Sequence, residues 1–236
     1  MNLILLQDGD FLDDEHVRLT GRKGEHIRVV HRPAEGDELT VGRIDGKLGR
    51  GRVLKVTAEA VDLRVVLDRD PPPPLPLTLV LALPRPKVLN RVVAAVTSMG
   101  VKRIFLMNAW RVEKSYWSSP RLSDENLLHQ RLLGLEQGAV DTLLPQIETR
   151  RLFRPFVEGE LAGISEGTMR LLAHPVADHE CPRGLRESVT LVIGPEGGFI
   201  EPEVASLRQQ GFEPVSIGQR VLRVETAVAA LIGRLF

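Results

Sequence analysis

A run of prolines divides the sequence. Of the six residues from Pro71 to Pro76, five are proline. Such a run can continue neither a helix nor a central strand, and it favours extended polyproline geometry. We therefore expect a stiff linker at residues 71–76, between an N-terminal domain of residues 1–70 and a C-terminal domain of residues 77–236. A proline-rich recognition segment is the alternative interpretation.

Residues 1–70 show the alternation of apolar and polar residues that is typical of antiparallel strands. Three segments carry this alternation, and turn sequences precede the first two: residues 38–42 after 34–37, residues 51–56 after 44–47, and residues 60–67. Short strands at this spacing, in about 70 residues, indicate a small β-barrel.

The same region contains a basic stretch. Between Arg43 and Lys55 there are five basic residues and one acidic residue, Asp45. The basic residues assigned to a possible RNA-facing surface are Arg43, Lys47, Arg50 and Arg52. They suit RNA because phosphate contacts supply much of the affinity of nucleic-acid-binding proteins. A solvated hairpin explains the same charges equally well.

After the linker the pattern changes to alternating strands and helices. Residues 77–83 form a continuous apolar run, as in a strand that is buried on both faces. The expected further elements are strands at 101–107, 170–173, 190–193 and 214–217, and helices at 88–99, 124–137, 201–210 and 224–236. Gly100 and Gly211 follow two of these helices, at the position that favours a left-handed backbone. The order predicts an α/β domain with a parallel sheet covered on both faces.

The composition excludes several classes of protein. Cys181 is the one cysteine, so the chain has neither an internal disulfide nor a cysteine cage for a metal. Its spacing from His174 and His179 matches no standard zinc pattern. Basic and acidic residues both total 31, so the chain as a whole gives no polyanion-binding signal. No apolar run reaches the roughly 20 residues of a membrane span, and we expect a soluble, cytoplasmic protein with no membrane association.

Two glycine-containing loops follow predicted strands near the C-terminus. The first reads Gly-Pro-Glu-Gly-Gly-Phe at residues 194–199, and the second reads Gly-Gln-Arg-Val-Leu-Arg-Val-Glu-Thr-Ala at residues 218–227. Glycine permits a positive φ and lets a ligand approach the backbone closely. The carboxyl end of a parallel strand is where α/β sheets bind ligands. Taken singly, the first loop is equally well an ordinary turn, and Arg223 and Glu225 are more simply a surface ion pair.

Together the two loops resemble one family, the 16S ribosomal RNA uracil-N3 methyltransferases of the SPOUT superfamily. The resemblance extends over nearly the whole chain and is strongest over residues 191–236. It implies a small PUA-like β-barrel followed by a SPOUT α/β domain with a deep trefoil knot. Knots are rare exceptions to the ordinary topology rules, so neither composition nor periodicity indicates one. The resemblance also implies a homodimer and a substrate in ribosomal RNA or the small ribosomal subunit.

Carried over position by position, the resemblance implies a pocket for S-adenosylmethionine as methyl donor, with no metal. The end of an earlier strand, residues 172–174, would form a third wall beside the two loops. The implied cofactor-binding residues are Leu172, Ala173, His174, Ile193, Gly194, Pro195, Glu196, Gly197, Gly198, Ile217, Gly218, Val221, Leu222, Arg223, Thr226 and Ala227.

The implied reaction moves a methyl group from the sulfonium to N3 of a uridine, which is uracil 1498 of 16S ribosomal RNA in the family. We expect Arg223 to stabilise the negative charge that develops on the uracil oxygens. Glu225 or Glu196 would orient Arg223 or accept the N3 proton. These three residues are the catalytic candidates.

The sequence departs from the family in two places. Many members carry a Gln-Lys pair before a Glu-Leu-Gly-Val turn, where residues 94–101 here read Ala-Ala-Val-Thr-Ser-Met-Gly-Val. They also carry Glu-Gln-Ser/Cys-Gly-Arg, where residues 136–140 read Glu-Gln-Gly-Ala-Val. Arg111 and Lys114, in a basic stretch with Tyr116 and Trp117, would supply an alternative RNA-contact surface. Ordinary packing explains the two aromatic residues equally well.

Three functions stay open at this point. The first is methylation of uracil N3 in 16S ribosomal RNA. The second is a methyltransferase of the same fold with a different RNA target, which the two departures favour. The third is a non-catalytic RNA-binding or ribosome-assembly protein, and the intact glycine loops argue against it.

Overall fold

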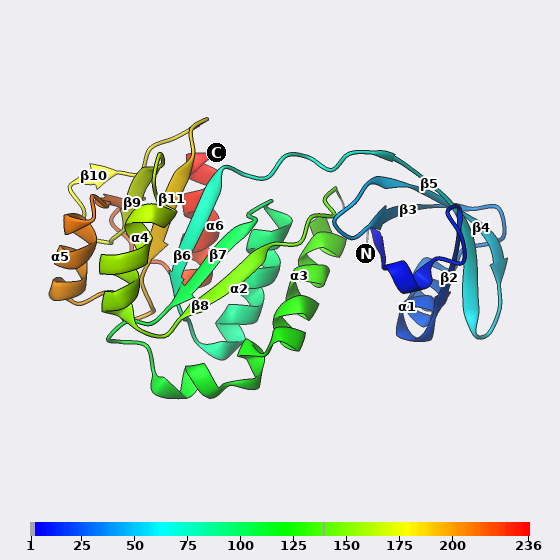
Figure 1. The fold of residues 1–236 in the computed structure, drawn as a ribbon, viewed down its shortest axis with the longest axis horizontal. Helices are drawn as coiled ribbons and strands as arrows, with labels where there is room; N and C mark the ends of the chain where they lie inside the picture. Colours follow the sequence, from blue (N-terminus) through cyan, green and yellow to red (C-terminus); the bar gives the residue numbers. More distant parts are fainter. Residues whose placement is uncertain (1–2, 139) are drawn as a thin grey trace. The chain divides into compact units, whose positions relative to one another are not determined.

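The computed structural model describes residues 3–138 and 140–236, which form two compact units (Figure 1). The first unit comprises the chain up to Pro73 together with Leu132–Leu144. The second unit comprises Pro74–Arg131 and Pro145–Phe236. The division falls inside the proline run, but the return of a later segment to the first unit has no signature in the sequence.

The first unit contains a curled five-stranded sheet with the order β1-β3-β4-β5-β2. Its strands are β1 (Ile4–Leu6), β2 (His16–Thr20), β3 (Glu38–Arg43), β4 (Leu48–Val56) and β5 (Ala60–Arg69). The short helix α1 (Gly21–His26) and the π-helical turn η2 (Ile27–His31) follow β2, and the 3₁₀ turn η1 (Asp8–Asp10) precedes it. Strand β1 is parallel to β3, and the other neighbours are antiparallel. The sheet is the expected small PUA-like barrel in a partly open form.

Alternation along the strands separates a core from a solvated face. Val61, Leu63 and Val65 of β5 are buried in the curl of the sheet. On β4 the same alternation leaves Arg50 and Arg52 exposed. The predicted basic residues of this strand therefore face solvent.

The segment that returns to the first unit holds the predicted turn at residues 44–47. The Asp45 backbone lies in the left-handed region, with φ of 55°, and its N–H donates to the carbonyl of Thr142 at 2.9 Å. Its carboxylate accepts from the N–H of Leu144 at 2.8 Å, and the Thr142 hydroxyl donates to the carbonyl of Gly46. A separate buried cluster joins the same segment to the sheet: Leu3, Leu5, Leu48 and Leu135. The barrel unit is therefore built from two distant parts of the chain.

The second unit contains seven parallel strands with the order β10-β12-β9-β11-β6-β7-β8. They are β6 (Leu77–Ala82), β7 (Arg103–Met107), β8 (Gln146–Arg150), β9 (Met169–Ala173), β10 (His179–Glu180), β11 (Val189–Ile193) and β12 (Glu213–Ser216). The helices and helical turns are α2 (Pro86–Ser98), η3 (Lys114–Ser118), η4 (Pro120–Leu122), α3 (Asp124–Gly138), η5 (Pro155–Glu160), α4 (Leu161–Ile164), α5 (Glu201–Gln209) and α6 (Val224–Leu235). Helix α3 belongs to this unit up to Arg131, and its residues from Leu132 belong to the first unit. The strands and long helices predicted for this region are confirmed, with ends within two residues. Strands β8 and β10 and the turn–helix pair η5–α4 are not predicted by the sequence.

Both faces of this sheet are covered. All six residues of β6 are buried, and successive residues of a strand point to opposite faces. Helix α2 packs against α6, and Phe105 of β7 lies 5.8 Å from Phe156 of η5 between ring centres. Because every strand is parallel, all carboxyl ends lie along one edge of the sheet, which we call the carboxyl edge.

Helix α2 ends in a Schellman motif. Gly100 has φ of 84°, and its N–H donates to the carbonyl of Thr97 at 3.1 Å. The N–H of Val101 donates to the carbonyl of Val96, also at 3.1 Å. These bonds satisfy the last carbonyls of the helix, which only a residue tolerant of positive φ permits. Helix α5 ends in the same way at Gly211, so both predicted helix ends are confirmed.

Within the described residues, no helix combines the length and apolarity that a membrane crossing needs.

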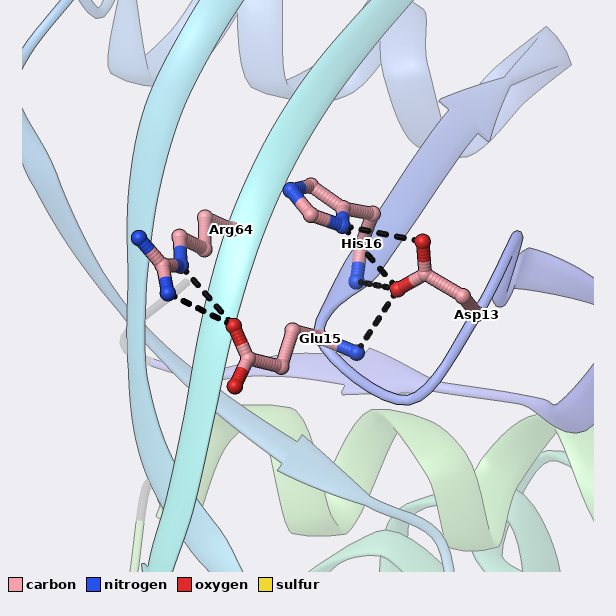
Figure 2. Close-up of polar contacts among 4 residues, drawn as sticks. All are labelled: Asp13, Glu15, His16 and Arg64. Atoms are coloured by element: carbon pink, nitrogen blue, oxygen red, sulfur yellow. Dashed lines mark hydrogen bonds and ion pairs between the residues drawn. The ribbon is translucent and has the colours of Figure 1, made fainter.

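Four polar residues fix the loop before β2 to β5 in the first unit (Figure 2). The Asp13 carboxylate accepts from the backbone N–H groups of Glu15 and His16, both at 2.9 Å. The imidazole Nδ1 of His16 lies 3.0 Å from the same carboxylate. Arg64 of β5 donates to the Glu15 carboxylate at 2.7 and 3.0 Å. The backbone hydrogen bond from Glu15, with the contact to His16, holds the pKa of Asp13 below its usual value.

We expect Asp13→Ala to lower the melting temperature of the protein at neutral pH, because the loop loses its hydrogen-bond acceptor. Since folding lowers the pKa of this carboxyl, its stabilisation is present above the unfolded pKa of about 4 and is lost as pH falls through the folded value. The difference in melting temperature between wild type and variant should therefore shrink below about pH 4. Thermal unfolding between pH 7 and pH 3 measures it, with the exposed neighbour in Asp14→Ala as control. A difference that does not change with pH would contradict the assignment.

Candidate active site

A cavity of about 820 Å³ opens at the carboxyl edge of the sheet in the second unit. Its walls come from the segments that follow β9, β11 and β12, from the start of α2 and from the first turns of α6. Parallel pairing brings these segments to one edge although the chain separates them widely. The volume lies in the range of small-molecule sites, and the position is where parallel sheets bind ligands.

Most of the predicted cofactor-binding residues line this cavity. They are Ala173, His174, Ile193, Gly194, Pro195, Glu196, Gly197, Gly198, Ile217, Gly218, Val221, Leu222, Arg223 and Ala227. Leu172 does not line it, because its side chain is fully buried within β9. Thr226 does not line it either, and its side chain is exposed on α6. The structure thus brings together both glycine loops and the end of β9, as expected.

Three cationic residues that the sequence did not assign to the site also line the cavity. Arg85 precedes α2, Arg91 lies on α2, and Arg220 lies in the second glycine loop. Arg220 lies within the motif at residues 218–227, so its position at the cavity is predictable from the sequence. Arg85 and Arg91 have no local signature, because α2 reaches the cavity only through the strand order that places β6 beside β11.

The first glycine loop is closely fitted to its surroundings. Gly198 has φ of 73°, a conformation that residues with a Cβ rarely adopt, and its N–H donates to the carbonyl of Pro195 at 2.8 Å. A guanidinium N–H of Arg111 donates to the carbonyl of Gly197. A Cβ on Gly197 would lie 2.9 Å from Cδ of Arg111, so a side chain at this position would require Arg111 to move. Arg111, predicted as an RNA contact, therefore also supports the cavity wall.

The two candidate carboxylates have separate partners. Oε1 of Glu196 accepts from the backbone N–H of Arg85 at 2.9 Å, which fixes the loop to the start of α2. Oε1 of Glu225 lies 3.7 Å from a guanidinium nitrogen of Arg91, and the Glu225 side chain is 23% exposed. In the described part of the chain neither carboxylate forms an ion pair with Arg223. No direct contact among the described residues therefore supports the expectation that Glu196 or Glu225 orients Arg223.

Arg223 is the N-cap residue of α6. Its carbonyl accepts from the N–H groups of Thr226 and Ala227, at 3.0 and 2.8 Å, which fixes its backbone. Its side chain is exposed at the cavity. A fixed backbone with an exposed guanidinium suits a group that meets a substrate.

The predicted RNA-binding residues of the first unit differ in their partners. Three of them lie beside acids: Arg43 is 2.9 Å from Asp8, Lys47 is 4.0 Å from Asp70, and Arg50 is 3.5 Å from Glu38. Arg52 is exposed and forms no ion pair within the residues that the structure describes. Exposed pairs of this kind are weak, so the three paired cations stay accessible to a ligand.

The basic and aromatic stretch after β7 divides into packed and exposed residues. Tyr116 and Trp117 are partly buried against the core of the second unit, which favours the packing interpretation. Burial, followed by the hydrogen bond to Glu113, raises the pKa of the Tyr116 phenol. Lys114 and Trp110 are exposed. Trp110 was not singled out from the sequence.

No metal-binding arrangement is found among residues 3–138 and 140–236: they hold no group of three or more His, Cys, Asp or Glu side chains placed to ligate an ion. His174, considered above as a metal ligand, lies at the cavity, with Nδ1 3.1 Å from the carbonyl oxygen of Val176.

Comparisons with known proteins agree with this geometry. A family model described as an RNA methyltransferase domain matches residues 71–235. The ribosomal RNA small subunit methyltransferase E of Treponema pallidum (strain Nichols) is 31% identical over 210 residues, which cover 87% of this chain and 79% of that protein.

Two solved structures match nearly the whole chain. A putative methyltransferase from Legionella pneumophila, described in complex with S-adenosylmethionine, has a TM-score of 0.71 and 24% identity, and the match covers 98% of this chain and 95% of that one. A ribosomal RNA small subunit methyltransferase E from Neisseria gonorrhoeae, described as bound to S-adenosylmethionine, has a TM-score of 0.71 and 20% identity over the same shares of the two chains.

These likenesses establish the fold as the α/β, trefoil-knotted SPOUT type preceded by a PUA-like barrel, as the resemblance of the two glycine loops implied. The family model covers well over half of the chain, and the Treponema relative is matched over most of its length. The chain therefore belongs to the ribosomal RNA small subunit methyltransferase E family, within the SPOUT superfamily.

Proposed function

We propose that this protein transfers a methyl group from S-adenosylmethionine to N3 of one uridine in the 16S RNA of the small ribosomal subunit, the uridine at 1498 in the family. The observation that carries the proposal is the meeting of both glycine loops and Arg223 at a single cavity. The family relatives named above support the substrate class.

The residues of the cavity fit S-adenosylmethionine. Ile193, Ile217 and Leu222 offer apolar surface for the adenine ring, and the backbone of the two loops offers donors and acceptors for its edge. Gly198 leaves the adjoining space empty, since a Cβ placed there meets no atom within 4 Å. When bound, S-adenosylmethionine supplies an electrophilic methyl group on its sulfonium, and transfer breaks the carbon–sulfur bond and leaves a thioether.

The residues of the chain have to prepare the uracil for this transfer. The N3–H bond must break, so that the nitrogen electron pair can form the new bond to carbon, and negative charge then develops on O2 and O4. The positive guanidinium of Arg223 stabilises that charge. The hydrogen-bonded backbone of Arg223 holds the group at the cavity before the substrate binds. Glu225, in the turn that begins with Arg223, is the better candidate to accept the proton, because Glu196 commits one carboxylate oxygen to the backbone of Arg85.

The remaining parts of the proposal concern assembly and RNA binding. We assign the first unit to RNA binding through the exposed basic face of β4, with Arg111 and Lys114 as contacts from the second unit. A homodimer in the cytoplasm completes the proposal. The family resemblance of the two glycine loops supports the homodimer.

Methylation in vitro tests the function as a whole. Small subunits or 16S RNA from cells that lack the protein are incubated with the enzyme and S-adenosylmethionine, and digested nucleosides are analysed by mass spectrometry. We expect one N3-methyluridine. A methyl group on another base would support the second function considered above, and no methylation at all would support a non-catalytic RNA-binding role.

Gly198→Val should weaken S-adenosylmethionine binding at least tenfold, which corresponds to about 1.4 kcal/mol. A branched side chain at positive φ strains the loop and projects from the cavity wall. Calorimetry on folded protein measures the affinity. Gly167→Val is the matched control, because Gly167 has φ of 69°, meets no atom within 4 Å of a placed Cβ and lies outside the cavity. Equal affinity in both variants would remove the loop from the cofactor site.

Arg223→Ala should lower turnover roughly 10²–10³-fold while it changes S-adenosylmethionine affinity only a few-fold. Its partner charge appears mainly in the transition state, so the loss falls on the chemical step. Single-turnover methyl transfer measures the first quantity, and calorimetry measures the second. Arg208→Ala on α5 removes the same charge away from the cavity and serves as control. A variant that loses only cofactor affinity would make Arg223 a binding residue.

Arg52→Ala should weaken RNA binding and lower the slope of log affinity against log salt by roughly 0.7, the value for one lost phosphate contact to single-stranded RNA. Arg18→Ala removes the same charge from a guanidinium already held by Asp62 at 2.8 Å, so its slope should change less. Salt-titrated binding by the full-length variants measures both. Equal slopes in wild type and Arg52→Ala would exclude this face of the barrel from the RNA site.

A further inference from the structure

The carboxyl edge continues past the cavity, over the ends of β7 and β8. The cavity itself uses the ends of β9, β11 and β12 and the start of α2. Strand β7 follows β6 in the sheet, and the N–H of Leu83 donates to the carbonyl of Met107 at 2.8 Å, so the ends of these two strands lie together. The loop after β7 carries Trp110, whose side chain is 78% exposed.

The backbone under this exposed indole is held at several points. The Trp110 N–H donates at 2.7 Å to Glu203, a carboxylate that is only 6% exposed and also accepts from Ile200 at the start of α5. On one side, the N–H of Asn108 donates to the carbonyl of Arg150 at 2.9 Å. A buried carboxylate therefore fixes the backbone of the residue whose ring is the most exposed in the loop. Tryptophan is enriched at binding surfaces, and an exposed indole on a fixed backbone suits stacking on a flat ligand.

The residue next to Trp110, Arg111, connects this loop to the cavity. The guanidinium of Arg111 donates to the carbonyl of Gly197, which lines the cavity. The segment 108–112 is thus attached to the cavity wall at the residue next to Trp110.

The charge around the ring suits an anion. Arg111 follows Trp110 directly in the chain, and Lys114 begins the turn η3 after the loop. The neighbouring acid, Glu113, already accepts the hydroxyl of Tyr116 at 3.1 Å. Two copies of this chain that met here through the same surface would bring like charges together. An RNA strand instead brings phosphates to the cations and flat bases to the ring.

We propose that Trp110 stacks on an unpaired base of the RNA substrate beside the target uridine, with Arg111 and Lys114 next to the flanking phosphates. The inference rests on the proposed function and adds a residue that selects RNA in which this base is unstacked. Stacking on an aromatic side chain is tolerant of base identity, so Trp110 contributes affinity and positioning more than sequence choice.

Binding of 16S RNA to full-length Trp110→Ala, Trp110→Phe and Trp117→Phe tests the proposal. We expect Trp110→Ala to lose about ten- to a hundredfold in RNA affinity, Trp110→Phe to keep most of it, and Trp117→Phe, which changes a partly buried ring, to stay near wild type. RNA should quench the tryptophan fluorescence of Trp117→Phe and leave that of Trp110→Phe nearly unchanged, since the chain has two tryptophans. Affinity for S-adenosylmethionine should be the same in all variants.

Three results would overturn the proposal. One is unchanged RNA affinity in Trp110→Ala, and another is wild-type protein that binds no 16S RNA. The third is a loss of the oligomeric state of wild type in Trp110→Ala by analytical ultracentrifugation, which would make the ring an interface between copies. Because the readout is binding, a wild type that binds RNA through Trp110 but forms no N3-methyluridine would contradict only the proposed function.

Discussion

The parallel pairing of seven strands in the second unit is the constraint on which the site depends. Parallel strands place all their carboxyl ends at one edge, so every loop that follows a strand is available to the same site. The end of β9, the glycine loops after β11 and β12 and the start of α2 together line one cavity for this reason. The loop after β7 extends the same edge toward Trp110. An antiparallel sheet would have sent half of these segments to the opposite edge.

Side chains that bond to distant backbone hold the edge in shape. Glu196 accepts from the backbone of Arg85, Arg111 donates to the backbone of Gly197, and Glu203 accepts from the backbone of Trp110. These hydrogen bonds therefore hold the loops at the cavity together before any ligand binds. Such preorganisation lowers the entropic cost of binding and fixes donors where charge develops during a reaction.

The sequence predicts local features well and distant ones poorly. Helix ends at Gly100 and Gly211 and the apolar run of β6 depend on a few consecutive residues, and the structure confirms them. The return of Leu132–Leu144 to the first unit and the pairing of Arg91 with Glu225 depend on tertiary contacts, which no local pattern records. The glycine loops were found together only because two motifs at a characteristic spacing resemble a family. Trp110 was missed because exposure cannot be read from an isolated tryptophan.

The central claim is that the cavity between the two glycine loops is where the methyl donor binds. A crystal structure of the full-length protein grown with S-adenosylmethionine tests it most directly. The account predicts density for the adenosine in contact with the backbone of residues 194–198 and 217–222, with the sulfonium methyl turned toward Arg223. Density for the ligand at another place on the protein, or an empty cavity at a saturating concentration, would contradict the account.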